Sequence, residues 1–218
     1  MTFVFASNNA HKLEEVRAIV PTLNILSLSE LGCHEDIPET QPTLEGNSLQ
    51  KAEYVRDWCL RHPEALPTDL CGCFADDTGL EIEALHGEPG VYTARWAGEA
   101  CDPAQNRLKA LRLLQGETNR KARFRTIVTL LQFDSAPLTF EVIVRGYIST
   151  EERGDHGFGY DAVFIPAPEE LQSVPSTFGL SSSELKDRTF AELPAELKNS
   201  ISHRARAMHK LAEYITNI

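Results

Sequence analysis

Two aspartates, Asp76 and Asp77, stand side by side directly after the apolar Phe74 and Ala75 and directly before Thr78 and Gly79. Adjacent carboxylates repel each other, and burying them costs free energy unless a cation or a hydrogen-bond donor faces them. A solvated turn is one interpretation, because Asp, Thr and Gly are ordinary turn residues. On an extended strand the two side chains would instead point to opposite faces. We therefore expect the two carboxylates to have different roles, one in a binding site and the other either anchoring the turn or supporting the residues of that site from behind.

A second polar cluster, residues 7–12 (Ser-Asn-Asn-Ala-His-Lys), lies where an apolar strand runs into a helix. The N-terminus of a helix presents unpaired N–H groups and a partial positive charge, and so it binds phosphate. Ser7, Asn9 and Lys12 would add side-chain donors. The cluster is not a Walker A loop, because the pattern G-x-x-x-x-G-K-[ST] is absent. A simple Asn cap with a solvated lysine is the alternative.

A third motif, His-Gly-Phe-Gly-Tyr-Asp at residues 156–161, places glycines on both sides of an aromatic ring. Glycines allow a backbone and a ring face to approach a planar ligand closely. A hairpin turn with a packed Phe158 would have the same pattern. The alternation of glycine with bulky residues favours a ligand.

Charged residues also occur at two predicted helix starts. Ser202 is a natural N-cap, which places His203 and Arg204 in a first turn, where each cation is disfavoured by about 0.3–1 kcal/mol. That placement is reasonable if an anion or a carbonyl group binds there. Glu39 and Glu45 precede a predicted helix, and with the two aspartates they could complete a Mg²⁺ site. Mg²⁺ typically takes one or two carboxylates together with substrate phosphates.

The composition excludes several classes of protein. The chain has 218 residues, 42% of them hydrophobic, and a formal net charge of -11, so we expect one sizeable core and no binding of nucleic-acid polymers or anionic membranes. The five cysteines fit no zinc spacing, which indicates reduced thiols. The start of the chain has no basic leader, and no stretch approaches the ~20 apolar residues of a membrane span. We therefore expect a cytoplasmic protein.

Hydrophobic periodicity and turn residues predict a β-α-β start and hence a parallel strand pair. The predicted elements are strands at residues 3–6, 23–28, 70–75, 123–133 and 139–149 and one ending at 164–165, and helices at 48–60, from Asp102 to Gly116 and from Ser202, with a first helix capped by Asn8 or Asn9. The 102–116 helix is expected to bury Leu108, Leu111 and Leu114, and residues 166–189 to form a surface loop. The predicted fold is a mixed α/β sheet with helices on both faces.

Five motifs in this order resemble the inosine triphosphate pyrophosphatase family, over nearly the whole chain. They are Ser-x-Asn-x-x-Lys at residues 7–12, Asp-Asp-Thr-Gly-Leu at 76–80, Gly-Glu-Pro-Gly-Val-Tyr-Thr-Ala-Arg at 87–95, Gly-Phe-Gly-Tyr-Asp at 157–161 and Ser-His-Arg at 202–204. The resemblance implies one elongated α/β domain, residues 1–218, with two lobes around a central substrate cleft. It also implies a Mg²⁺-dependent homodimer that hydrolyses ITP, dITP and XTP to the monophosphate and pyrophosphate.

The same resemblance assigns roles to residues. Asp77 would be the proton acceptor and, with Glu39, a metal ligand. The triphosphate would contact Ser7, Asn8, Asn9, Ala10, His11, Lys12 and Lys51. Thr78 would contact the substrate, and the base and ribose would contact Phe158, Gly159, Tyr160, Asp161, Lys198, His203 and Arg204. The expected selection for 6-oxo purines would come from His203 or Arg204 donating to the O6 carbonyl.

The chain departs from the family pattern at three places. Gly46 stands where the family commonly has Glu, Ala162 replaces a Pro, and the 166–189 stretch is longer than expected. Two other functions therefore stay open. One is a Maf-like pyrophosphatase for pyrimidine or methylated nucleotides, although residues 7–12 do not resemble the Ser- and Arg-rich loop of those proteins. The other is a nucleotide-binding regulatory module that has lost catalysis, for which Gly46 is the main support.

Overall fold

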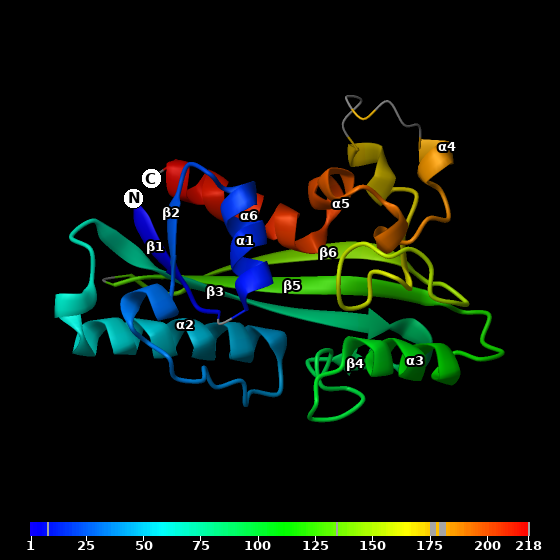
Figure 1. Cartoon of the computed structure of the whole chain (residues 1–218), viewed down its shortest axis with the longest axis horizontal. Coiled ribbons are helices and arrows are strands. Elements are labelled where there is room, and N and C mark those ends of the chain that lie inside the picture. The colour runs from blue at the N-terminus through cyan, green and yellow to red at the C-terminus, as the bar shows by residue number, and fades with distance from the viewer. Residues whose placement is uncertain (8, 134, 175–177, 179–181, 218) are drawn as a thin grey trace. The chain divides into compact units, whose positions relative to one another are not determined.

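The computed structural model describes the whole chain except residues 8, 134, 175–177, 179–181 and 218 (Figure 1). The described residues form a seven-stranded sheet with the order β2-β1-β3-β5-β6-β7, and β4 pairs with β3. The strands are β1 (Thr2–Phe5), β2 (Asn24–Ser27), β3 (Leu70–Ile82), β4 (Pro89–Gly90), β5 (Lys121–Gln132), β6 (Leu138–Ile148) and β7 (Phe164–Pro166). The α-helices are α1 (Ala10–Ile19), α2 (Leu44–Arg61), α3 (Pro103–Leu113), α4 (Ser182–Leu185), α5 (Ala195–Ile201) and α6 (His203–Thr216). The predicted mixed α/β fold is confirmed.

The chain divides into two compact units. Unit 1 consists of Met1–Asp77, Thr126–Val142 and Ala205–Ile218, and unit 2 consists of Thr78–Arg125 and Ile143–Arg204. The chain therefore passes from one unit to the other within β3, β5 and β6 and near the start of α6. None of the described helices is long and apolar enough to span a membrane.

Unit 1 begins with the predicted β-α-β unit, in which β1 pairs in parallel with both β2 and β3. Because successive side chains of a strand point to opposite faces, the unit 1 strands carry one layer of side chains on each face of the sheet. Helix α2 packs on one face in a cluster that includes Val4, Ala6, Ala52, Val55, Cys59, Cys73 and Ala75. Phe5 and Phe74 point to the other face, where their rings stack 5.0 Å apart. Figure 1 shows α1 and α6 on the opposite side of the unit 1 strands from α2.

The caps explain where the two unit 1 helices begin. Asn9 caps α1, because its side-chain oxygen accepts a hydrogen bond from the backbone N–H of Lys12 at 3.1 Å. Thr43 caps α2 in the same way, accepting from the N–H of Gly46 at 3.0 Å. Helix α2 consequently starts at Leu44, four residues earlier than the sequence predicted.

Strand β3 does not end at the aspartate pair, so the predicted turn at Thr78 and Gly79 is wrong. The strand continues to Ile82, and its last residues belong to unit 2. Leu80 and Ile82 are fully buried, and Leu80 pairs with Gly90 of β4 in antiparallel register. The alternation of buried apolar side chains thus carries the strand past two residues that are common in turns.

Of the three leucines predicted to be buried by helix α3, Leu114 is confirmed, Leu111 is half-buried and Leu108 is exposed. Ala110 and Asn106 are buried on the helix and Leu114 is fully buried at its C-cap, whereas Leu108 is 52% exposed. Asn106 holds the preceding loop, because its side chain bonds the backbone of Ala94 and Ala97 at 2.7 Å each. A buried amide with two backbone partners thus fixes the rotation of α3 about its axis.

The segment at residues 166–189 has short helices within its described part. A 3-10 helix covers Glu170–Ser173 and α4 covers Ser182–Leu185, while residues 175–177 and 179–181 lie outside the described residues. Helix α5, which follows Pro194, was not predicted from the sequence.

Candidate active site

Asp76 and Asp77 lie in the same strand and bind lysines from different helices. Asp76, which is 1% exposed, accepts hydrogen bonds from Lys12 Nζ of α1 at 3.0 Å and 3.1 Å. Asp77, which is 8% exposed, accepts one from Lys51 Nζ of α2 at 2.9 Å. The predicted opposite orientation of the two carboxylates is therefore confirmed.

Lys51 joins Asp77 to a second carboxylate. Its Nζ donates to Glu39 Oε1 at 2.8 Å, and the Lys51 side chain is only 4% exposed. Asn47, one helical turn before Lys51, donates from Nδ2 to Asp77 Oδ2 at 3.3 Å. Glu39 and Asp77 thus converge on one ammonium group, and Asp77 has a neutral donor on its other oxygen.

The electrostatics of this group favour a proton acceptor at Asp77. Burial raises the pKa of Asp77, and the nearby Glu39 raises it further, while Lys51 partly offsets both by lowering it. Burial alone would lower the pKa of Lys51, but the carboxylates of Asp77, Asp76 and Glu39 outweigh burial and raise it. Lys51 therefore stays protonated, and Asp77 is a stronger base than an ordinary aspartate.

The donor set of Glu39 and Asp77 fits a divalent cation of the Mg²⁺ type. Both carboxylates accept a hydrogen bond from the same positively charged group, the Lys51 ammonium. Mg²⁺ uses one or two carboxylates plus water and phosphate oxygens. No group of three or more His, Cys, Asp or Glu side chains suited to a metal occurs among the described residues. Water and substrate oxygens would have to supply the remaining ligands. Glu45 is exposed in the first turn of α2.

The N-terminus of α1 carries the predicted phosphate-binding residues of unit 1. Ser7 Oγ accepts a hydrogen bond from the backbone N–H of Asn9 at 3.2 Å, which orders the approach to the helix. Ser7, Asn9 and Ala10 line a cavity of about 260 Å³ together with residues from β2 and the segment after it. Asn8 and the side chain of His11 lie outside the described residues. The Lys12 side chain is not part of the described cavity lining, and its ammonium donates to both oxygens of Asp76.

Unit 2 holds the predicted base-binding residues around a tight turn. Gly157 and Gly159 both adopt positive φ angles, +79° and +63°. Asp161, which is 4% exposed, closes the turn by accepting from the backbone N–H of Phe158 at 2.8 Å. The same oxygen accepts from Lys198 Nζ at 2.7 Å. A Cβ at Gly157 would lie 2.2 Å from this oxygen, so only glycine fits there.

The ring of Phe158 is 42% exposed and lies near two cations. Lys198 Nζ is 4.8 Å and Arg204 Cζ is 5.2 Å from its centroid. His203 is buried and stacks on Phe124 at 4.4 Å. Unit 2 therefore brings together an exposed aromatic face and cationic donors, which suits a planar ligand with carbonyl groups.

Tyr160 and Thr78 differ from the other predicted substrate contacts. Tyr160 is buried, its hydroxyl donates to the carbonyl of Thr93 at 3.0 Å, and burial raises its pKa. This bond ties the Phe158 turn to the 87–95 motif. Thr78 is half-buried in β3 and is the first residue of unit 2.

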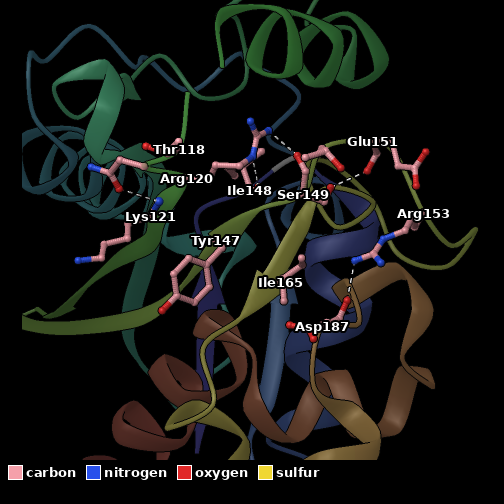
Figure 2. Close-up of a pocket in the computed structure, with 12 residues that line it drawn as sticks. Thr118, Arg120, Lys121, Tyr147, Ile148, Ser149, Glu151, Arg153, Ile165 and Asp187 are labelled. Carbon is pink, nitrogen blue, oxygen red and sulfur yellow. Dashed lines mark hydrogen bonds between the residues drawn. The ribbon is translucent and has the colours of Figure 1, made fainter. Parts of the chain in front are cut away.

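A larger cavity in unit 2, about 700 Å³, contains none of the predicted site residues among its described lining (Figure 2). Arg120, the cation drawn at its upper wall, donates to the carbonyls of Leu114, Ile148 and Ser149. Arg153 likewise donates to the carbonyl of Asp187. These guanidinium groups are held by backbone carbonyls around the cavity.

Sequence reasoning missed two residues of the site. Asn47 precedes Lys51 by four positions, the spacing that places two side chains on one helix face, and this spacing could have identified it. Arg107 of α3 donates from Nη1 to the carbonyl of Gly159 at 2.8 Å. No local pattern distinguishes Arg107 from an ordinary surface arginine of a helix.

Comparisons with known proteins give a consistent result. The sequence model of the Ham1 family matches residues 3–214. A dITP/XTP pyrophosphatase of Flavobacterium johnsoniae is 42% identical over 219 residues, covering 99% of this chain and 98% of the relative. One of Porphyromonas gingivalis is 44% identical over 214 residues, covering 97% and 96%. The solved structure of a Staphylococcus aureus Ham1 protein has a TM-score of 0.76 at 33% identity, covering 100% of this chain and 99% of the other. That of a Coxiella burnetii HAM1 protein has a TM-score of 0.77 at 32% identity, with full coverage of both chains.

Proposed function

Because the chain belongs to the Ham1 family, we propose that it hydrolyses dITP and XTP, the nucleotides in the names of its relatives, to the nucleoside monophosphate and pyrophosphate. The motif resemblance and the family match agree that the chain is a nucleoside triphosphate pyrophosphatase. ITP as a further substrate, a requirement for Mg²⁺, a homodimer and a cytoplasmic location belong to the same proposal. They are supported by the five motifs in their family order.

The observation that carries the proposed chemistry is the buried pair of Asp77 and Lys51, with Nζ and Oδ1 2.9 Å apart. Asp77 accepts a proton from a water molecule whose oxygen attacks the α-phosphorus. The new bond joins that oxygen to phosphorus, the bond to the bridging oxygen of the β-phosphate breaks, and pyrophosphate leaves. A base whose pKa is raised toward the working pH is more effective in this step.

The basic groups of unit 1 hold the triphosphate during this reaction. Lys12 and Lys51 each have three donors, and in this structure each is neutralised by carboxylates. Phosphate oxygens arriving at the α1 N-terminus offer these lysines a second set of acceptors. Phosphoryl transfer depends mainly on positioning and on neutralising charge, which is what these groups provide.

Glu39 and Asp77 would hold a Mg²⁺ ion, which would supply positive charge to offset that of the triphosphate. The two acids converge on one point of unit 1, which is the property that a shared cation requires. Lys51 Nζ lies at that point in this structure, 2.8 Å from Glu39 Oε1 and 2.9 Å from Asp77 Oδ1.

Selection for a 6-oxo purine follows from the donors of unit 2. Phe158 stacks on the base, and Arg204 or His203 donates to the O6 carbonyl. The 6-amino group of adenine would place donor against donor. Leaving such buried groups unpaired costs about 1–3 kcal/mol, and more for a charged group. Slow hydrolysis of ATP and dATP is therefore part of the proposal.

The test is turnover on dITP, XTP, ITP, GTP, dATP and dTTP, with and without Mg²⁺, by an assay that separates pyrophosphate from orthophosphate. Pyrophosphate from dITP, XTP and ITP, and only when Mg²⁺ is present, is the expected result. Orthophosphate as the product would overturn the attack at the α-phosphorus. Tight binding of dITP without turnover would replace the enzyme with a regulatory module.

A further inference from the structure

The turn that presents Phe158 needs support from outside itself. Gly157 and Gly159 have the widest conformational freedom of any residue type, and the ring between them is 42% exposed. A stacking ring fixes a base only if its own backbone is fixed. Two backbone groups of the turn are bound by charged side chains: the N–H of Phe158 by Asp161, and the carbonyl of Gly159 by Arg107.

Arg107 reaches the turn from α3 and is itself held in place. Its Nη1 lies 2.8 Å from the carbonyl oxygen of Gly159. Its other face meets Glu152, with Nε 3.1 Å from Oε1 and Nη2 3.3 Å from Oε2. The Arg107 side chain is 18% exposed and that of Glu152 is 36% exposed, so the bond to Gly159 is the better shielded of the two contacts. Nη1 and Nη2 thus link α3 to the turn and to Glu152 through one hydrogen bond each.

We propose that Arg107 is a positioning residue for base recognition, which acts by holding the Phe158 turn through Gly159. This proposal rests on the proposed function, because it assigns the Phe158 ring to the purine base. Arg107 lies outside all five motifs that carried the family resemblance. Its role concerns how this chain aligns the ring, whereas the phosphate and metal groups of unit 1 do not depend on it.

Loss of this contact has a specific kinetic signature. A loose turn weakens stacking on the base in the ground state and in the transition state alike, which raises KM more than it lowers kcat. A 6-oxo purine also loses the alignment of its O6 with the donors of unit 2, whereas adenine has no such bond to lose. The preference for dITP over dATP therefore falls. Tripolyphosphate, which has no base, should bind as before.

The experiment compares Arg107→Met with Arg112→Met, which removes the same charge from an exposed position in α3. We expect Arg107→Met to raise the KM for dITP about tenfold, as for one charge-assisted hydrogen bond, with kcat within about threefold. The ratio of kcat/KM for dITP to that for dATP should fall in parallel. The inhibition constant of tripolyphosphate should stay at the wild-type value, and Arg112→Met should behave as wild type. Arg107→Lys should give an intermediate KM, because lysine cannot reproduce the fork.

Hydrogen exchange separates this proposal from the proposed function. Amides at residues 155–161 should exchange faster in Arg107→Met than in Arg112→Met, while α2 and β3 keep their protection. If the wild type hydrolyses neither dITP nor XTP, the proposed function fails, and the exchange result still decides whether Arg107 holds the turn. Unchanged exchange there, an unchanged KM, or an equal loss of tripolyphosphate binding would each overturn the role of Arg107.

Discussion

Lys51 and Asp77 form a buried ion pair, with Nζ 2.9 Å from Oδ1, between helix α2 and strand β3. The residue proposed to bind phosphate and the residue proposed to accept a proton are therefore direct partners before substrate arrives. Glu39 is the solvent-facing member of this group, since its side chain is 43% exposed. Changes at either member of the pair should consequently affect both the chemistry and the charge balance of unit 1.

Asp77→Asn should lower kcat for dITP by about 10²–10⁴-fold, the usual contribution of a general base. The amide oxygen can still accept a hydrogen bond from Lys51, so the fold should persist. Steady-state kinetics together with circular dichroism would measure the two effects. Asp57→Asn, at an exposed carboxylate of α2, serves as the matched control. A kcat near the wild-type value would remove Asp77 from the mechanism.

Lys51→Met should make the stability of the protein depend on Mg²⁺. Without the ammonium group, Glu39 and Asp77 repel each other, and a divalent cation that binds both stabilises the native state by mass action. Added Mg²⁺ in the absence of nucleotide should therefore raise Tm more in this variant than in wild type. Thermal unfolding with Lys210→Met, an exposed lysine of α6, provides the comparison. Equal Mg²⁺ responses in all three proteins would argue against a shared cation site.

Gly46→Glu, which restores the residue common in the family, should destabilise this chain without raising turnover. A Cβ at this position would lie 2.7 Å from the Cβ of Gln41 and 3.1 Å from the capping Oγ1 of Thr43. Overpacking of this kind costs about 1–3 kcal/mol. Urea unfolding would measure the loss. Adding Gln41→Gly to the Gly46→Glu variant should recover part of the lost stability. A Gly46→Glu variant with higher turnover and unchanged stability would instead show that Gly46 impairs catalysis in this chain.

Stability should fall in alkaline solution because of Cys59. Burial raises the pKa of this thiol from 9.0 to about 11, with the nearby Cys33 adding to the effect. Between these two pKa values the folded protein keeps a thiol proton that the unfolded chain loses. The contribution of Cys59 to the free energy of unfolding is therefore complete below pH 9 and is lost as the pH rises through about 11.

Urea unfolding at a series of alkaline pH values tests this expectation. Cys59→Ala should give a shallower decline of the unfolding free energy with pH, because the titrating thiol is gone. Cys101→Ala, at an exposed thiol, should leave the slope unchanged. Identical slopes for wild type and Cys59→Ala would contradict the assignment.

Local rules predicted the orientation of the aspartates but not the course of their strand. Strand alternation alone places Asp76 and Asp77 on opposite faces. The strand continues through them because Lys12 and Lys51, 64 and 26 residues away in sequence, neutralise the two charges. A sequence pattern within a few residues of the pair contains no sign of those distant partners.

In unit 2, too, local sequence predicted some features, whereas others depend on residues distant in the sequence. The glycines at 157 and 159 predicted a close turn, since their conformational freedom is a property of the residue itself. The exposure of Leu108 and the contact of Arg107 with Gly159 depend on the rotation of α3, which Asn106 fixes through a loop. Helix α5 is too short for periodicity to reveal, so the placement of Lys198 required the structure.

The path of the chain has a consequence for how this enzyme can diversify. Residues 1–77, 126–142 and 205–218 form unit 1, and the intervening segments form unit 2, so neither unit is a continuous piece of the polypeptide. No single continuous exchange of coding sequence can therefore transplant unit 2, the half proposed to recognise the base, into another protein. Substitution at individual positions, such as those around Phe158, is open to this scaffold, whereas exchange of unit 2 as one continuous module is not.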